Sequence, residues 1–583
     1  MILDRINGPK DLKTLSASER KELAQEIRQA MLKRASIHGG HFGPDFGIVE
    51  ATIALHTVFD SPKDKIVWDV SHQVYPHKIL TGRKQAYLEE EHYDDVSGYS
   101  NPAESEHDFF EVGHTSTSIS LASGLAMARD LQGGHENIIA VIGDGSMSGG
   151  EALEGLDTVG EMGTNMIIVL NDNQISIAEV HGGMYKGFEE LRRTGGKSEH
   201  NLFRAMGLDY RFVADGNDSE ALIKVFREVK DIDHPVVVHI VTQKGKGYKF
   251  AEEDKESWHW HMPFDIETGE VKHPYVDEAA ELTATYLLDR MKTDKKLAVL
   301  TAATPSSFGF TSERRKQAGK QFIDVGIAEE QAVAMASGLA KGGARPVFGD
   351  YATFFQRTYD QISQDVCINN NPAVFLVFGA SMYSMNDVTH LCIFDIPMMA
   401  NIPNLVYLAP VSLAEYKAML AWALDQTDHP VAIRVPVLPV SSEGRVIRTD
   451  YSQLNTYEVT RRGEEVAILG LGNFYGLAEQ TAAELEKKGI HATIINPTYI
   501  TGLDTDLLES LKKDHRLVVT MEDGVLDGGF GEKIARFYGS SDMKTCAFGL
   551  EKKFYDRYDY EKLAEEYNLK PELAAKQILD LIK

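Results

Sequence analysis

The stretch Ile138-Ile139-Ala140-Val141-Ile142-Gly143-Asp144-Gly145-Ser146 joins a short apolar run to a glycine-rich turn. A second apolar run at 166–170 ends in Asn171-Asp172-Asn173. Short runs of β-branched and apolar residues predict buried strands, and the region 150–161 between them has a helical pattern. This order of strand, helix and strand predicts a parallel sheet. The two polar turns are then expected at one edge, because the carboxyl ends of parallel strands lie together.

The same alternation continues on both sides of this stretch and predicts an α/β fold. Polar segments at 251–276 and 437–452 interrupt it, and each is predicted to connect two domains. A chain of 583 residues also exceeds what one core normally organises. We therefore predict three consecutive α/β domains with mainly parallel sheets, at 1–275, 276–440 and 441–583. Further strands are predicted at 236–241, 298–301, 346–348, 373–378, 405–408, 431–435, 466–471, 491–495 and 517–521, and helices at 329–340, 413–424, 477–488 and 561–583.

Charge and composition exclude several classes of protein. The chain has 60 Lys and Arg against 87 Asp and Glu, a formal charge of −27 at pH 7. This charge repels nucleic acid and anionic membrane surfaces, so neither is an expected partner. The cysteines Cys367, Cys392 and Cys546 form no C-x-x-C pair and indicate neither disulfides nor a thiolate zinc site. No signal-peptide pattern and no run of about 18 apolar residues occurs, so we expect a cytoplasmic protein.

The two polar turns contain the residue types of a metal and phosphate site. Asp144 and Asn173 supply the oxygen ligands that a hard cation beside a diphosphate requires. Gly143 and Gly145 allow the backbone to approach phosphate closely, and the following helix start adds N–H donors. A Gly-Asp-Gly sequence alone is most often an ordinary turn. Its pairing with an asparagine turn one strand later predicts a site for a cation and a diphosphate.

Gly-Asp-Gly followed by Asn-Asp-Asn is similar to the thiamine-diphosphate motif of the transketolase superfamily. Longer motifs point to one family within this superfamily. By these motifs the chain resembles 1-deoxy-D-xylulose-5-phosphate synthases over nearly its whole length. The motifs are SIHGGHFG (36–43), IVWDVSHQVYPHKILTGR (66–83), VGHTSTSIS (112–120), KGKGY (244–248), DVGIAE (324–329) and YATFFQRTYDQ (351–361).

The resemblance implies thiamine diphosphate and Mg²⁺ as cofactors. Glu329 matches the carboxylate that pairs with a ring nitrogen of the cofactor's pyrimidine and promotes loss of the thiazolium proton. Phe354 matches the aromatic residue that stacks on that ring. The expected metal ligands are Asp144, Asn173 and Ile175. The residues expected to line the cofactor are His72, Gly113, His114, Thr115, Gly145, Ser146, Asn173, Tyr248, Glu329 and Phe354.

The resemblance also implies a substrate side with three histidines. His41 and His259 match imidazoles that flank the reactive carbon, and His390 matches a further substrate-side histidine. Histidine suits proton transfer because its pKa lies near neutral pH. Tyr351 and Arg434 are expected to bind substrate, and Arg434 matches one of two arginines that hold the acceptor's phosphate in the family.

The chain departs from the family pattern on this acceptor side. Gly379 stands where the family has the other phosphate-binding arginine. Asn386 stands where an aspartate is expected, and Leu391 and Cys392 replace a glutamine and a glycine. The segment between Asn173 and Asn201 is also shorter than the family's usual mobile segment. Losing one charged hydrogen bond to a phosphate could cost about 1.5–3 kcal/mol.

Three functions follow from these residues. The leading expectation is a transferase that decarboxylates pyruvate and condenses the two-carbon unit with glyceraldehyde 3-phosphate, in isoprenoid biosynthesis. An alternative keeps this donor chemistry and uses another aldehyde or a ketose as acceptor. A third is a cofactor-binding protein without activity, against which the intact Glu329, His41 and His259 argue. In each case the resemblance implies a homodimer.

Overall fold

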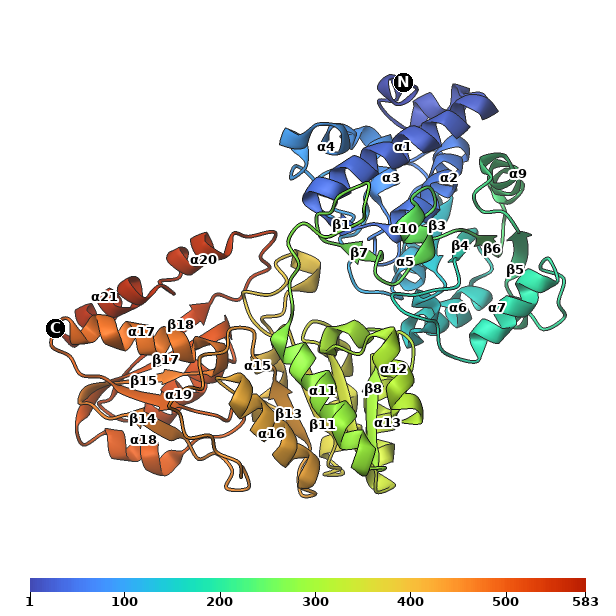
Figure 1. Ribbon diagram of the computed structural model, residues 1–583. Helices are drawn as coiled ribbons and strands as arrows, with labels where there is room; N and C mark the ends of the chain where they lie inside the picture. Colours follow the sequence, from blue (N-terminus) through green and yellow to red (C-terminus); the bar gives the residue numbers. More distant parts are fainter. The chain divides into compact units, whose positions relative to one another are not determined.

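Three sheets of five or six mainly parallel strands carry the fold, and helices pack against them (Figure 1). The structure is a computed structural model that describes all 583 residues. The chain divides into two units. Met1–Tyr275 with Gly326–Ala328 form the first unit, and Val276–Val325 with Glu329–Lys583 form the second. The first unit holds one of these sheets and the second unit holds two, as expected for a mainly parallel α/β chain.

The sheet of the first unit has the strand order β2-β3-β4-β6-β5, and every neighbouring pair is parallel. Its central strands are apolar and buried along their length, as the β-branched runs predict. Gly143 at the end of β3 pairs with Asn171 near the end of β4, so the two polar turns do lie side by side. The strands are β2 (Lys65–Trp68), β3 (Ile138–Gly143), β4 (Met166–Asp172), β5 (Asp209–Val213) and β6 (Pro235–Val241).

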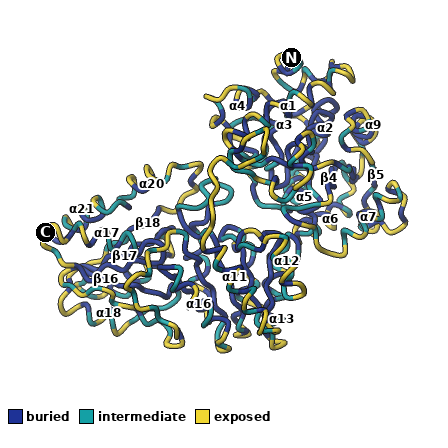
Figure 2. The backbone as a smooth tube through the Cα atoms, viewed as in Figure 1, coloured by how far each residue is buried: buried dark blue, intermediate teal, exposed yellow.

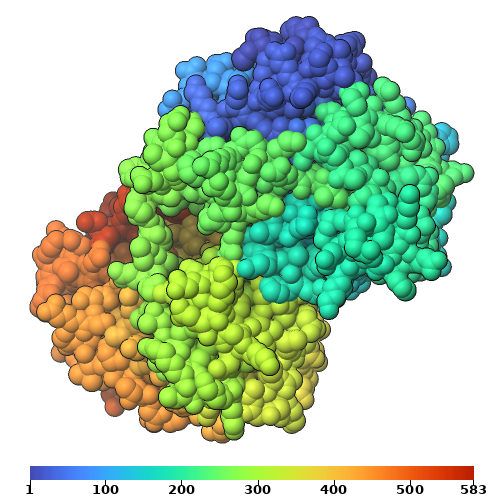
Figure 3. All heavy atoms as spheres, turned by 45° about the vertical axis from the view of Figure 1, so that its right-hand side comes forward, coloured from blue at the N-terminus to red at the C-terminus, as the bar shows by residue number.

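Helices cover this sheet and bring distant parts of the chain together. Helix α1 begins with a capping box, in which Ser16 and Glu19 satisfy each other's backbone N–H groups. Helix α2 is buried along its whole length and packs against α9. N-terminal residues therefore lie against residues more than 150 positions later, blue against green in Figure 3. The main helices are α1 (Ala17–His38), α2 (Gly43–Val58), α5 (Ser118–Leu131), α6 (Gly150–Met162), α7 (Met184–Arg193) and α9 (Ser219–Val229).

The segment 251–276 is more than a connection, which corrects the prediction. Strand β7 (Trp260–His261) pairs antiparallel with β1 (Gly40–His41). Trp258 and Phe264 are buried in the core of the first unit. These aromatic residues pack inward, although the polar residues between them conceal this in the sequence.

The first sheet of the second unit has six parallel strands in the order β12-β13-β11-β10-β8-β9. Its strands are β8 (Leu297–Thr301), β9 (Phe322–Asp324), β10 (Arg345–Tyr351), β11 (Val374–Phe378), β12 (Val406–Leu408) and β13 (Val431–Arg434). Its main helices are α11 (Glu278–Thr293), α12 (Ser312–Ala318), α13 (Glu329–Lys341), α15 (Asp395–Met399) and α16 (Leu413–Asp425).

The second sheet of this unit has the order β14-β16-β15-β17-β18, with β14 as an antiparallel edge strand. Figure 2 shows its inner strands as buried. One hydrophobic core includes Phe375 from the six-stranded sheet and Leu469 from this one. The elements are β14 (Glu458–Arg461), β15 (Glu465–Gly470), β16 (Thr493–Asn496), β17 (His515–Val525), β18 (Lys544–Leu550), α17 (Tyr475–Glu486), α18 (Thr505–Leu511), α19 (Phe530–Tyr538), α20 (Tyr560–Glu566) and α21 (Pro571–Ile582).

The predicted strands are present with small shifts at their ends, but one predicted helix is wrong. The region 561–583 forms two helices, α20 and α21, rather than one. Pro571 begins α21, since proline fits the first turn of a helix and cannot continue one. The segment 437–452 contains no helix or strand, as expected of a connection. No helix of the structure is both long and apolar enough to cross a membrane.

Candidate active site

Asp144 and Asn173 follow neighbouring strands of the first unit and are both buried. The backbone N–H of Gln174 donates to Asp144 Oδ2 at 2.9 Å, which ties the two turns together. Burial, and secondly the charge of Asp172, raises the pKa of Asp144 to about 8. The side-chain oxygen of Asn173 is buried without a hydrogen-bond partner. A buried carboxylate next to a buried amide oxygen that has no hydrogen-bond partner fits a divalent cation.

The turn itself leaves room for close backbone approach. A Cβ atom at Gly145 would lie 2.8 Å from Ser176 Oγ, so only glycine fits there. Ser146 is buried next to it, and its carbonyl accepts from Ser116 Oγ at 2.7 Å. Ile175 pairs with Glu179 in an isolated bridge. These residues, with the two turns, fit a bound cation and diphosphate.

The expected cofactor residues Gly113, His114 and Thr115 lie in a loop that Asp69 organises. Asp69 is buried after β2 and accepts the backbone N–H groups of Ser116 and Ser118, at 2.8 and 3.0 Å. The second of these begins α5, so the carboxylate also caps that helix. Sequence reasoning missed Asp69, although it stands inside the quoted motif at 66–83.

Three predicted histidines form one cluster in the first unit. The ring centroids of His41 and His72 are 4.9 Å apart, those of His72 and His259 5.1 Å, and those of His41 and His259 5.7 Å. Burial lowers the pKa of His72 to about 3, and its Nδ1 atom has no hydrogen-bond partner. His72 is therefore a neutral ring available to a ligand.

Lys244 joins this cluster, and sequence reasoning missed it within the motif at 244–248. Its Nζ atom lies 3.0 Å from His259 Nδ1. When Lys244 is protonated, its ammonium group donates to this nitrogen and favours the tautomer of neutral His259 with the ring proton on Nε2. Burial lowers the pKa of Lys244 to about 7. Burial, and secondly the charge of Lys244, also lowers the pKa of His259 well below its usual value, which keeps the ring neutral.

Tyr248 is not brought to this cluster. Its ring packs against Phe42 and Trp258, with centroids 5.4 and 5.0 Å away. Its hydroxyl donates to the carbonyl of Ile266 at 2.9 Å. Both contacts are those of a core tyrosine, and they do not support the predicted contact with a cofactor.

In the second unit, Glu329 begins α13 and is buried. Its Oε2 atom accepts no hydrogen bond and lies 3.7 Å from Arg357 Nη1. Burial raises the pKa of Glu329 to about 6, and the charge of Arg357 opposes that rise. A buried carboxylate oxygen without a donor fits an N–H group of a bound ligand.

Asp350, at the end of β10, is a second buried acid that sequence reasoning missed. Its Oδ1 atom accepts from Thr304 Oγ1 at 2.9 Å and from the backbone N–H of Tyr351 at 2.8 Å. Burial, and secondly the charge of Glu329, raises the pKa of Asp350 well above its usual value. Asp350 therefore favours the protonated form and leaves Glu329 as the carboxylate of this pair.

Phe354, Tyr351 and His390 lie together in the second unit. The rings of Phe354 and His390 meet edge to face, with centroids 5.7 Å apart, and Tyr351 lies 6.3 Å from Phe354. The hydroxyl of Thr389 contacts His390 Nδ1 at 2.8 Å. The structure thus brings these three predicted residues to one place.

Gly379, the most distinctive departure from the family, has a left-handed backbone with φ of +66°. A Cβ atom there would lie 2.8 Å from Ser384 Oγ and 3.3 Å from Tyr351 Cδ1. Any side chain at 379 would therefore be strained and crowded in this conformation. Leu391 and Cys392 are both buried, so this side of the loop is apolar.

Arg434 is bound to two carboxylates and does not lie free to receive a phosphate, which counts against its predicted role. Its Nε atom donates to Asp395 at 2.8 Å, and its Nη1 atom donates to Asp523. Tyr407 also donates to Asp395, and Asn473 donates to Asp523. All three charged side chains are fully buried. The arginine therefore joins β13, α15 and β17 of the second unit.

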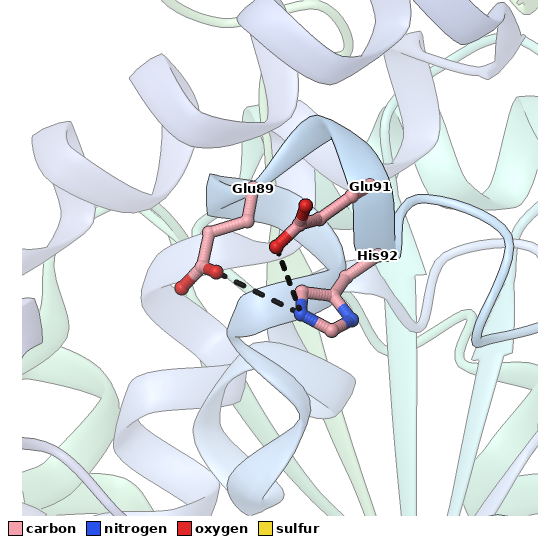
Figure 4. Close-up of side chains that lie close together, drawn as sticks. All are labelled: Glu89, Glu91 and His92. Atoms are coloured by element: carbon pink, nitrogen blue, oxygen red, sulfur yellow. Dashed lines mark ion pairs between the residues drawn. The ribbon is translucent and has the colours of Figure 1, made fainter.

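Only one other cluster has the composition of a metal site. Glu89, Glu91 and His92 lie close together on the surface of the first unit (Figure 4). The two acids are 3.7 and 3.8 Å from His92 Nε2, and Asp95 accepts from Nδ1 of the same ring at 2.7 Å. These contacts are ordinary exposed ion pairs.

Comparison with known proteins agrees with these observations. The family profile "1-deoxy-D-xylulose-5-phosphate synthase" matches residues 3–198 and 194–242. The profiles "Transketolase, pyrimidine binding domain" and "Transketolase, C-terminal domain" match residues 279–440 and 455–572. Proteins named 1-deoxy-D-xylulose-5-phosphate synthase from Clostridium beijerinckii and Clostridium acetobutylicum are 36% and 37% identical. The first comparison covers all of this chain and 99% of the relative, and the second 99% of each.

Among solved structures, a transketolase from Pichia stipitis is 15% identical over 97% of this chain and 98% of its own, with a TM-score of 0.45. The sheets and the matched profiles define a transketolase-type α/β protein. The chain belongs to the 1-deoxy-D-xylulose-5-phosphate synthase family, whose members are thiamine-diphosphate-dependent transferases.

Proposed function

We propose that the chain decarboxylates pyruvate with thiamine diphosphate and condenses the two-carbon unit with glyceraldehyde 3-phosphate. The observation that carries this proposal is the paired turn of Asp144 and Asn173, with its two buried oxygen groups at adjoining strand ends. The full-length similarity to the named synthases supports the same reaction. Bound thiamine diphosphate would supply a thiazolium carbon that attacks the keto carbon of pyruvate and accepts the electrons left by carbon dioxide.

In this proposal the first unit binds the diphosphate end of the cofactor. Asp144, Asn173 and the carbonyl of Ile175 would hold Mg²⁺, since all three offer the oxygen ligands that this ion prefers. Gly145, Ser146 and the loop 113–115 would contact the diphosphate, because glycine turns and helix starts present backbone N–H groups.

Proton handling falls to Glu329 in the second unit. Its Oε2 atom, which accepts no hydrogen bond, would accept a ring N–H of the pyrimidine, and Phe354 would stack on that ring. A carboxylate placed there holds a proton on the ring and so favours the form that removes the thiazolium proton. Asp350, in its protonated form, would leave the negative charge on Glu329.

His259 and His41 are proposed to exchange protons with the bound substrate. Protonated Lys244 favours the tautomer of His259 with the proton on Nε2, and this atom would donate to an oxygen that becomes negative during the reaction. His390, beside Phe354, would act at the acceptor. The neutral ring of His259 suits this role because it has one N–H donor and one acceptor nitrogen.

The requirement for thiamine diphosphate and Mg²⁺ tests the proposed decarboxylation of pyruvate. Purified enzyme should release carbon dioxide from pyruvate in the presence of glyceraldehyde 3-phosphate only when thiamine diphosphate and Mg²⁺ are both added. A chelator should stop the release, and Asp144→Ala should prevent its recovery at ordinary Mg²⁺ concentrations. Release that is independent of thiamine diphosphate would refute the proposal.

A second candidate function has a specific observation in its favour. Arg434 is neutralised by Asp395 and Asp523, and Gly379 offers no charge, so neither position supplies a free cation for a phosphate. An acceptor aldehyde without a phosphate, or with it held elsewhere, would be compatible with these two positions. Competition between D-glyceraldehyde and glyceraldehyde 3-phosphate decides between the two. A kcat/KM that favours the phosphorylated aldehyde supports the leading function, and the reverse supports the second.

The domain boundaries at 275 and 440 and a homodimer also belong to the proposal. Met127 and Leu131 lie four residues apart on α5 and are 55% and 88% exposed, so they adjoin on one face of the helix, and this apolar face supports a partner over it. Light scattering at micromolar concentration should give about twice the chain mass of 64.7 kDa. A monomer mass would refute the dimer. The cytoplasmic location stays a prediction.

A further inference from the structure

Residues 556–560, which end the segment after β18 and include the first residue of α20, contact a loop that carries His390. We call residues 556–560 the brace and residues 382–390 the acceptor loop. Both belong to the second unit. One end of the acceptor loop lies beside Gly379, where Ser384 limits the space, and the other end places His390 edge-on to Phe354. The position of this loop therefore affects the residues proposed to meet the acceptor.

Every second residue of the acceptor loop from 382 to 388 is bonded to the brace. Two of these five bonds come from tyrosine hydroxyls, and all five involve a backbone group of the acceptor loop or of the brace. The bonds run from Tyr558 Oη to the Met382 carbonyl (2.7 Å), Tyr560 Oη to the Ser384 carbonyl (2.6 Å), the Arg557 N–H to the Asn386 carbonyl (2.7 Å), Asn386 Nδ2 to the Tyr558 carbonyl (2.9 Å) and the Val388 N–H to Asp556 Oδ1 (3.3 Å).

These bonds explain the asparagine at 386. Its side-chain amide donates to the carbonyl oxygen of Tyr558. An ionised aspartate has no proton to donate and would place a negative charge against that carbonyl. Asn386 is thus matched to the brace, so its departure from the family pattern has a local physical reason.

We propose that the brace positions the acceptor loop and thereby sets how well the acceptor aldehyde binds. Tyr558, Tyr560 and Asn386 are positioning residues in this inference, because they act through the loop and not on the reacting atoms. The inference rests on the proposed function, in which an aldehyde is the second substrate. It assigns to the C-terminal part of the chain a role in acceptor selectivity.

Steady-state kinetics of the full-length holoenzyme tests the brace with pyruvate and glyceraldehyde 3-phosphate. Tyr558→Phe and Tyr560→Phe should each raise the KM of the aldehyde about fivefold, the equivalent of one ordinary hydrogen bond, and leave the KM of pyruvate unchanged. Tyr555→Phe is the matched control, since its hydroxyl donates to the Glu551 carbonyl of its own segment at 3.0 Å. An unchanged aldehyde KM, an equal rise for pyruvate, or an equal effect of the control would overturn the inference.

The pH dependence of Asn386→Asp gives a readout that a loss of folding would not produce. Above the pKa of the new carboxyl group the aldehyde KM should be raised relative to wild type. Below it, the protonated carboxyl can donate to Tyr558 again, so the ratio should fall toward one as pH drops through that pKa, which is about 4 for an ordinary aspartate. A ratio that does not change with pH contradicts the brace.

A failure of the proposed function can be distinguished from a failure of the brace. If wild-type enzyme consumes no pyruvate with any aldehyde, the proposed function is wrong, and hydrogen exchange still tests the brace. Amides 384–390 should exchange faster in Tyr558→Phe and Tyr560→Phe than in wild type and in Tyr555→Phe. Unchanged exchange in both variants would overturn the brace alone.

Discussion

Glu329 is buried at the start of α13, and its Oε2 atom accepts no hydrogen bond. Its folded-state pKa of about 6 is raised above the ordinary value of a glutamate, so the protonated form is favoured as pH falls toward that value. In the proposed reaction only the ionised form supports loss of the thiazolium proton. The activity of this residue should therefore be complete at high pH and be lost on the acid side.

Proton exchange at the thiazolium carbon checks this role. In wild-type holoenzyme the exchange rate, followed by proton NMR, should be constant above neutral pH and fall as pH drops through about 6 or lower, because a bound N–H donor lowers the pKa further. Glu329→Gln should slow exchange at least about a hundredfold at every pH. Glu330→Gln, one residue away and partly exposed, is the control. Rapid exchange in Glu329→Gln would exclude the role.

At the level of residues, the sequence predicted the groups that stand in long motifs and missed their supports. Asp144, Asn173, Glu329 and the histidines could be found because they occur in ordered motifs. Asp69 and Lys244 were missed, since their roles depend on which backbone group or ring they reach in three dimensions. Arg434 matches a phosphate-binding arginine of the family in sequence. Its two acidic partners come from distant parts of the chain, so its buried ion pairs could not be predicted.

At the level of elements, apolar runs predicted the central strands well because buried parallel strands are apolar on both faces. The edge strands β2, β5, β9, β14 and β18 were missed, since each is short or carries charged residues. The helix break before Pro571 was missed too, although proline at a helix start is a known signal. Aromatic residues within the polar segment 251–276 gave no strand pattern, so its packing into the first unit was not foreseen.

The loop before α5 is held by the buried carboxylate of Asp69, and a substitution of Asp69 tests what this support contributes. Asp69→Ala leaves two buried N–H groups without an acceptor, so we expect a loss of about 1–3 kcal/mol in unfolding free energy. Calorimetry should also show weaker binding of thiamine diphosphate, because the loop 113–115 loses its support. Asp218→Ala is the control, since Asp218 accepts two N–H groups at the exposed start of α9. Unchanged cofactor affinity in Asp69→Ala would show that the loop 113–115 does not contribute to binding thiamine diphosphate.

At the scale of the whole molecule, the buried ion network around Arg434 joins the two sheets of the second unit. Asp395 follows the six-stranded sheet's β11 in the chain, and Asp523 lies on β17 of the other sheet. Removing the arginine would leave two buried carboxylates uncompensated. The network is therefore expected to stabilise the packing of these two sheets against each other.

Chemical denaturation tests this role of the arginine. Arg434→Met should lower the unfolding free energy by about 3–5 kcal/mol at neutral pH. Arg445→Met removes a partly exposed arginine that pairs with Glu479 and should cost less than about 1 kcal/mol. If both variants lower the unfolding free energy by the same amount, the buried ion pairs of Arg434 do not stabilise the second unit more than an exposed pair does.

The conversion of isotopically labelled pyruvate tests the central claim most directly. Wild-type enzyme with thiamine diphosphate, Mg²⁺ and glyceraldehyde 3-phosphate is incubated with pyruvate labelled at its keto carbon, and the products are followed by carbon NMR. We predict that the label appears as the keto carbon of a 1-deoxyketose phosphate, with one carbon dioxide released for each product molecule. Unconverted pyruvate in the presence of this and other aldehydes, from folded and cofactor-bound enzyme, would contradict the account.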